Sequence, residues 1–139
     1  MSNSQRYRDQ HNEILDIAKQ IGALLNPADL TAKHAEVSKL LNVLAGKIKI
    51  HLSVEDQNLY PSLVKHSDSK VRELATSFSK EMIPITDAFT KYYTKWAAGS
   101  AVTKDPNGFI TETKGIFAAL DKRIQKENTI LYAEFDKAG

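Results

Sequence analysis

The chain has 139 residues, enough for one domain with a substantial core, and its 19 Lys and Arg against 17 Asp and Glu give a net charge of +2. The basic residues are spread among acidic ones, which disfavours nucleic-acid binding, and six glycines and four prolines are too few for a turn-rich β protein. The lack of cysteine excludes disulfides, thiolate metal sites and cysteine nucleophiles.

The start of the chain is polar and lacks the apolar core of a secretion signal. No apolar run approaches the roughly 20 residues that span a bilayer. We therefore expect a cytoplasmic protein without a membrane partner, folded as a single domain over residues 1–139.

Breaks in the pattern divide the chain into helical segments. Asn26 and Asp105 each precede a proline, which is typical of an N-cap followed by proline at the first helical position. Residues 66–69 hold no apolar side chain and offer further caps, and Gly99 predicts a left-handed stop at a helix end. These breaks leave four predicted helices, over residues 4–25, 28–65, 69–98 and 106–136.

Each segment carries apolar residues alternately three and four positions apart, the period of an amphipathic α-helix. They are Ile14, Ala18, Ile21 and Leu25 in the first, Val37, Leu41, Leu44 and Ile48 in the second, Val71, Phe78, Ile85 and Phe89 in the third, and Ile116, Leu120 and Ile130 in the fourth. Short connections between long helices favour antiparallel neighbours. The sequence therefore predicts an all-α protein, an antiparallel up-down-up-down four-helix bundle, with a kink at Pro84 in the third helix.

Polar residues interrupt these apolar stripes at positions assigned to the core: His11, His51, Glu55, Arg123 and Glu127. A histidine alone in a core is commonly a hydrogen-bonded structural residue, and an Arg–Glu pair four residues apart is commonly a surface pair. A buried charge without a partner costs several kcal/mol, however. Five such residues on the predicted core faces therefore favour a cluster that satisfies itself or a site that holds a ligand.

The sequence around these residues is weakly repeated. Residues 51–60 align with residues 123–132 at an offset of 72, with matching Glu, Leu and Tyr, and residues 10–16 align with residues 81–87 at an offset of 71, with matching Ile and Asp. The matches are few, so chance alignment is the alternative. A true repeat predicts two helical hairpins related by a pseudo-twofold axis.

Equivalence of the two hairpins would explain the polar residues. Met82 and Arg123 in the second hairpin then stand where His11 and His51 stand in the first, and both hairpins keep a glutamate. A symmetric ancestor would have had one histidine from each helix and one glutamate per hairpin. That set is enough for two metal ions bridged by two carboxylates.

At these residues the sequence resembles the hemerythrin-like family, also called the HHE cation-binding domain. The resemblance extends over the whole chain and is strongest from His51 to Pro61, with an echo at Leu131 and Tyr132. It implies a four-helix bundle with a non-haem diiron centre. The family's ligands are a His on the first helix, His-x-x-x-Glu on the second, a His on the third and His-x-x-x-Glu on the fourth.

Carried over residue by residue, the resemblance implies that His11, His51, Glu55 and Glu127 are metal ligands. The sequence departs from the family where Met82 and Arg123 replace the histidines of the third and fourth helices. In the family both lost positions serve the same iron. We therefore expect one Fe ion rather than two, and two histidines with carboxylates suit non-haem Fe(II).

Four further residues are expected around this site. Arg123 cannot ligate a metal, because its guanidinium is always protonated, but it could replace the missing cation by bonding both carboxylates. Met82 is expected to fill volume in the core. It is a poor ligand for iron, because its soft thioether would suit Cu(I) instead. Tyr60 and Tyr132 lie one turn beyond the two glutamates, where core packing is favoured over hydrogen bonding to the site.

The charges limit the number of metal ions. Two ionised glutamates and one arginine sum to minus one; one divalent ion changes this to plus one, which an anionic ligand such as hydroxide would neutralise. Protonation of one glutamate also gives neutrality without a metal. Charge therefore admits one ion or none, and it disfavours two.

Three functional hypotheses remain. The first is a non-haem iron-binding protein with a one-iron site that senses or handles O₂, NO or iron, so that its partner is a small diatomic ligand or a metal ion. The second is a metal-free scaffold whose Arg–Glu–His cluster is structural or binds a small ligand. The third is an enzyme that uses an open metal site for oxidation or peroxide removal. Diiron O₂ carriage is disfavoured, because it draws one electron from each of two irons.

Overall fold

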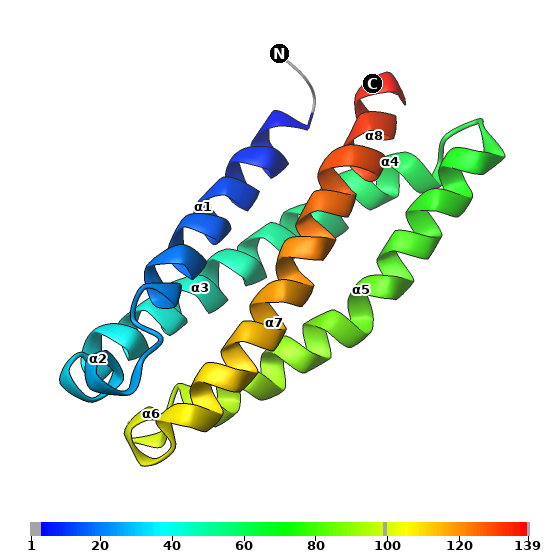
Figure 1. Cartoon of the computed structure of the whole chain (residues 1–139). Helices are drawn as coiled ribbons and strands as arrows, with labels where there is room; N and C mark the ends of the chain where they lie inside the picture. The colour runs from blue at the N-terminus through cyan, green and yellow to red at the C-terminus, as the bar shows by residue number, and fades with distance from the viewer. Residues whose placement is uncertain (1–3, 99, 139) are drawn as a thin grey trace.

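A computed structural model describes residues 4–98 and 100–138, and the fold is 89% helical. Four long helices run antiparallel to one another (Figure 1). They are α1 (Gln5–Gly22), α3 (His34–Val54), α5 (Ser69–Trp96) and α7 (Pro106–Lys126). The predicted all-α class and antiparallel helical bundle are confirmed.

Shorter elements complete the bundle. They are α2 (Pro27–Ala32), the π-helix η1 (Glu55–Leu59), α4 (Tyr60–Val64), α6 (Ala101–Lys104), the π-helix η2 (Glu127–Leu131) and α8 (Tyr132–Ala138). The chain continues from α3 through η1 into α4, and from α7 through η2 into α8, as two long rods (Figure 1). The two π-helices were not predicted, and they lie at the site described below.

The predicted caps are confirmed. The side chains of Asn26 and Asp105 accept hydrogen bonds of 2.9 and 3.0 Å from the backbone N–H three residues on, and Asp68 accepts one of 2.9 Å from the N–H two residues on. Each bond satisfies a backbone donor that the first turn of a helix leaves without a partner. The predicted stop at Gly99 lies outside the described residues.

The predicted helix over residues 28–65 is wrong near its start. The backbone of Lys33 leaves helical geometry, with φ −119° and ψ 28°, and separates α2 from α3. The break lets α2 contact α6 and α7, where Leu30 is fully buried. Burial of an apolar side chain at the end of the bundle outweighs the hydrogen bonds that a continuous helix would keep.

Pro84 lies inside α5, which remains helical on both sides of it. Proline donates no hydrogen bond to the preceding turn and crowds the carbonyl four residues back, which bends a helix. The green middle part of α5 changes direction in Figure 1, as the proline predicts.

Two apolar clusters fill the core, with polar residues between them. One includes Ile14, Leu44 and Phe109, and the other includes Tyr7 and Leu131. The buried polar side chains lie on the helices between these two clusters. Apolar residues therefore flank them on both sides, and they have little access to water. Within the described residues, no helix has both the length and the apolar character needed to cross a bilayer.

Candidate metal centre

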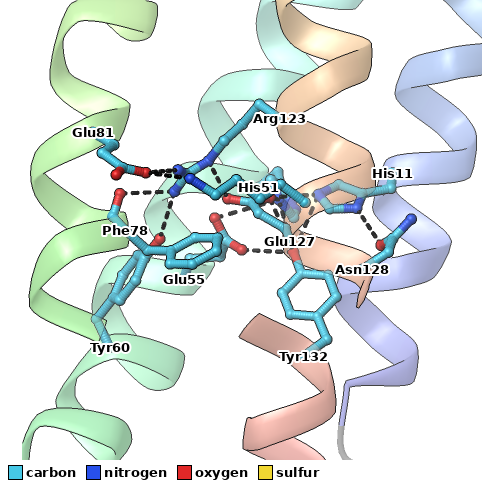
Figure 2. Close-up of polar contacts among 11 residues, drawn as sticks. His11, His51, Glu55, Tyr60, Phe78, Glu81, Arg123, Glu127, Asn128 and Tyr132 are labelled. Carbon is cyan, nitrogen blue, oxygen red and sulfur yellow. Dashed lines mark hydrogen bonds and ion pairs between the residues drawn. The ribbon is translucent and has the colours of Figure 1, made fainter. Parts of the chain in front are cut away.

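Four buried side chains converge in the polar layer of the bundle. His11, His51, Glu55 and Glu127 are between 1% and 4% exposed, and each offers one ligand atom within 4.8 Å of the others. They come from α1, α3, η1 and η2 and point toward one another (Figure 2). The fold thus brings together all four residues that the sequence suggested as ligands.

Both imidazoles direct Nε2 toward the carboxylates. His11 Nε2 lies 2.9 Å from Glu127 Oε1, and His51 Nε2 lies 3.4 Å from Glu55 Oε1 and 3.8 Å from Glu127 Oε1. Nitrogen and oxygen atoms therefore alternate around one small volume. Imidazole nitrogen and carboxylate oxygen are donors that suit non-haem iron.

The far side of each imidazole is held by a side-chain amide. His11 Nδ1 lies 2.8 Å from Asn128 Oδ1, and His51 Nδ1 lies 2.7 Å from Gln10 Oε1. An amide oxygen only accepts, so each Nδ1 carries the proton and donates it. In a neutral imidazole, Nε2 then presents its lone pair to the centre, as a metal ligand must.

Sequence reasoning missed both amides. Gln10 directly precedes His11 and Asn128 directly follows Glu127, so each adjoins a predicted ligand, but each bonds a histidine on another helix. Nothing in the helical period indicates such a cross-helix pair.

The charges of the cluster shift its ionisation strongly. Burial lowers the pKa of His51, but the nearby carboxylates of Glu127 and Glu55 outweigh burial and raise this pKa to about 9. Burial raises the pKa of Glu127, yet hydrogen bonds from His11 and His51 and the charge of Arg123 lower it to about 2. In the metal-free protein a histidinium–carboxylate pair therefore occupies the centre at neutral pH.

Each π-helix begins on a glutamate of the cluster. The N–H of Tyr60 bonds the carbonyl of Glu55, and the N–H of Tyr132 bonds the carbonyl of Glu127, in both cases five residues back. A residue five positions on lies about 140° around an ordinary α-helix, whereas a π turn returns it to the same face. The π-helices therefore turn both tyrosines toward the site.

Tyr132 places its hydroxyl among the four candidate ligands. The hydroxyl donates to Glu55 Oε2 at 2.6 Å and lies 3.1 Å from His11 Nε2, 3.4 Å from His51 Nε2 and 3.5 Å from Glu127 Oε1. Burial and the charges of Glu127 and Glu55 hold the pKa of Tyr132 far above its usual range. The side chain is fully buried, so it both packs in the core and bonds the cluster.

Arg123 is buried beside the cluster and holds Glu127. Its Nε donates to Glu127 Oε2 at 3.0 Å, and its Nη2 donates to the carbonyl of Phe78 at 2.7 Å and to the hydroxyl of Tyr60 at 3.4 Å. The guanidinium also lies 4.6 Å from the centre of the Phe78 ring. These contacts fix a permanent positive charge next to one candidate ligand.

The expectation that Arg123 bonds both carboxylates of the cluster needs correction. Its second carboxylate partner is Glu81 on α5, at 3.6 Å, and not Glu55 (Figure 2). The reason is that Phe78 draws the guanidinium toward α5 and away from η1. Glu81 was missed, although it adjoins Met82, a position that the sequence had singled out.

Met82 lies outside the polar cluster. It is half-buried and lines a cavity of about 700 Å³ between α3, η1 and α5, together with Asp56 and Tyr60. Met82 therefore fills volume only in part.

Two features of the structure can be compared across the weak sequence repeat. The two π-helices begin 72 residues apart, at Glu55 and Glu127. The positions aligned with His11 and its partner Asn128 are Met82 and Asp56, which both line the cavity. The equivalent of His51 with Gln10 is Arg123 with Glu81. A pseudo-twofold repeat predicts this pair of equivalent contacts.

One buried carboxylate oxygen of the cluster has no hydrogen-bond partner. Within the part of the chain that the structure describes, Glu55 Oε1 makes no hydrogen bond, and His51 Nε2 at 3.4 Å is its charged neighbour. A buried carboxylate oxygen without a partner costs about 1–3 kcal/mol or more. A cation among the four ligand atoms would satisfy it, so the residues fit a metal ion.

Comparison with known proteins gives the same answer. Residues 3–135 match the family model of the hemerythrin HHE cation binding domain. Comparisons with curated proteins and with solved structures gave no match. The matched residues span nearly the whole chain and include the buried His and Glu cluster. The chain belongs to the hemerythrin HHE cation-binding domain family.

Proposed function

We propose that the protein binds one non-haem iron ion per chain through His11, His51, Glu55 and Glu127, and that it senses or handles O₂, NO or iron. The convergence of four buried ligand atoms within 4.8 Å carries this proposal. Iron bound there would supply a redox-active Lewis acid able to take a small ligand at an open position.

The surrounding residues support binding by the neutral forms of the histidines. Asn128 and Gln10 fix the imidazoles with Nε2 inward, and Arg123 fixes the carboxylate of Glu127. Hydrogen-bonded partners of this kind orient ligands and raise their affinity for metal. The apolar clusters on either side restrict access of water to the site.

A single ion is proposed because of Arg123. Its guanidinium lies 3.0 Å from Glu127 and is only 5% exposed, so a second dication close by would face a fixed positive charge. Met82 offers no nitrogen or oxygen ligand in that half. Diiron chemistry is therefore not proposed.

The second candidate is a metal-free scaffold with a structural cluster. The hydrogen bond from Tyr132 to Glu55 and the 2.9 Å hydrogen bond between His11 Nε2 and Glu127 Oε1 favour it, because they satisfy much of the cluster internally. The unsatisfied Glu55 Oε1 favours the metal. Both candidates are binding or structural roles, and neither includes a catalytic reaction.

Elemental analysis decides between the two. Protein is made in iron-supplemented cells, purified without a metal-affinity tag and reconstituted anaerobically with Fe(II). We expect one iron per chain in the unmodified protein and loss of iron in His51→Ala, while His34→Ala, on an exposed residue, retains it. Unmodified protein that stays iron-free after reconstitution would favour the metal-free scaffold.

We also propose that residues 1–139 form a single domain located in the cytoplasm. The family match over residues 3–135 supports the first statement. The cysteine-free composition is compatible with a reducing compartment and supports the second.

A further inference from the structure

We propose that the phenolate oxygen of Tyr132 is a fifth protein ligand to the iron ion. This inference rests on the proposed iron site and adds a residue that the family's histidine and glutamate pattern does not contain. Three independent observations carry it: the distances around the hydroxyl, the charge of the site and the fixed position of the ring.

The distances match those within one coordination sphere. An octahedral ion with bonds of about 2.1 Å holds neighbouring donor atoms about 3.0 Å apart. The Tyr132 oxygen lies 3.1 Å from His11 Nε2, 3.4 Å from His51 Nε2 and 3.5 Å from Glu127 Oε1, and 2.6 Å from Oε2 of Glu55, the carboxylate oxygen beside the unsatisfied Oε1. The Tyr132 oxygen therefore has neighbours in His11, His51 and Glu127 at about the spacing of donors that share one ion, and its fourth neighbour is the Glu55 carboxylate.

With a ferrous ion, the charge of the buried site leaves room for one more anion. A divalent ion with ionised Glu55 and Glu127 is neutral, and the adjacent Arg123 leaves a charge of plus one in a buried region. Glu81 does not cancel this charge, because it is half-exposed and also pairs with Lys126 at 2.9 Å. A phenolate from Tyr132 would bring the buried sum to zero.

The ring of Tyr132 is held so that the hydroxyl stays at the centre. It stacks on Tyr7 with 5.6 Å between ring centres and on the His11 ring with 5.2 Å, and Arg8 lies 5.5 Å from its centre. The π turn that starts at Glu127 sets the direction of the side chain. A ligand fixed in advance loses little conformational entropy when the ion binds.

Tyr60 provides the contrast. It occupies the equivalent position after the first π-helix, but its hydroxyl accepts from Arg123 at 3.4 Å, where the second ion of a symmetric site would lie. Tyr60 therefore has a fixed cation as neighbour and Tyr132 has the donor set. Of this pair, only Tyr132 is a ligand in the proposal.

Ligation has a defined proton balance. The O–H bond of Tyr132 breaks as the oxygen–iron bond forms, and the proton leaves to solvent, so this residue releases one proton per ion bound. No electron moves in this step. A phenolate is a hard anionic donor, and tyrosine also holds the haem iron of catalase. Ligation by Tyr132 would therefore favour the ferric state.

The test is the colour of the ferric protein. The chain is loaded with Fe(II) under anaerobic conditions, oxidised in air and examined by visible absorption and by resonance Raman spectroscopy. We expect a phenolate-to-iron charge-transfer band with tyrosinate vibrations in the unmodified protein. Tyr132→Phe should lose the band, and the matched control Tyr60→Phe should keep it. Circular dichroism checks that both variants are folded.

Three other outcomes of this experiment would overturn the proposal. Unmodified ferric protein that holds one iron per chain without tyrosinate vibrations would overturn ligation by Tyr132 and leave the proposed iron site intact. A band that persists in Tyr132→Phe would also overturn it. Protein that takes up no iron would overturn both the ligation and the proposed function. The Raman measurement on the unmodified chain needs no variant to fold.

Discussion

Gln10 and Glu81 occupy equivalent positions in the two halves of the bundle, and each contacts the equivalent partner. Gln10 Oε1 lies 2.7 Å from His51 Nδ1, and Glu81 Oε2 lies 3.6 Å from Arg123 Nη1. Glu81 therefore stands to Arg123 as Gln10 stands to His51. We expect that histidines placed at positions 82 and 123 would find polar partners of the same kind.

Met82→His together with Arg123→His should raise the iron content from one to two per chain. The new imidazole at position 82 would have Asp56 as the equivalent of Asn128, and Glu81 faces position 123. Metal per chain is measured by elemental analysis after anaerobic reconstitution. Met82→His alone should stay at one iron, because Arg123 remains. An unchanged content in the double variant would show that these two positions do not set the number of ions.

Asn128→Leu should weaken iron binding about 10–100-fold, because residues that hold a metal-ligating imidazole contribute this much to affinity. The change removes the acceptor 2.8 Å from His11 Nδ1 and leaves every candidate ligand in place. Competition with a chelator of known affinity measures the effect. Asp56→Leu is the matched control at the equivalent exposed position of η1, and equal losses in both variants would contradict the assigned role of Asn128.

The helices and the candidate ligands could be predicted because both are local properties of the sequence. Apolar spacing defines the buried face of a helix, and His11, His51 and Glu127 lie on that face by simple counting. The N-caps at Asn26 and Asp105 are equally local. These features depend on a few neighbouring residues.

The remaining features depend on contacts between helices. The break at Lys33 follows from burial of Leu30 against the far end of the bundle. The π turn before Tyr132 changes the number of residues per turn. A prediction that assumes 3.6 residues per turn therefore places the Tyr132 side chain on another face of the helix. The bond from Asn128 to His11 joins residues 117 positions apart. No local pattern contains this information.

The metal-free protein should be most stable between about pH 4.5 and 6.5. The pKa of His51 rises from 6.5 to about 9 on folding, so its stabilisation is complete below 6.5 and is lost as pH rises toward 9, by up to about 1.4 kcal/mol per pH unit. The pKa of Glu127 falls from 4.5 to about 2, so its stabilisation is present above 4.5 and is lost as pH falls.

Urea unfolding of chelator-treated protein across this pH range measures the effect. His51→Gln should flatten the alkaline side of the curve, and Glu127→Gln should flatten the acid side. A free energy of unfolding that rises between pH 6.5 and 9 in the unmodified protein would contradict the assignment to His51.

The π-helix before Tyr132 also makes the site sensitive to chain length. Five residues in a π turn take the place of an ordinary α-helical turn, so η2 is equivalent to an α-helix with one residue inserted. Deleting the exposed Thr129 would restore the regular period and rotate Tyr132 by about 100° around the helix axis, together with the rest of α8. A one-codon insertion or deletion could therefore add or remove the phenolic oxygen while every histidine and glutamate of the cluster stays unchanged. A change in the length of η2 is therefore a second route, besides substitution of Tyr132, by which the proposed metal environment of this bundle could change.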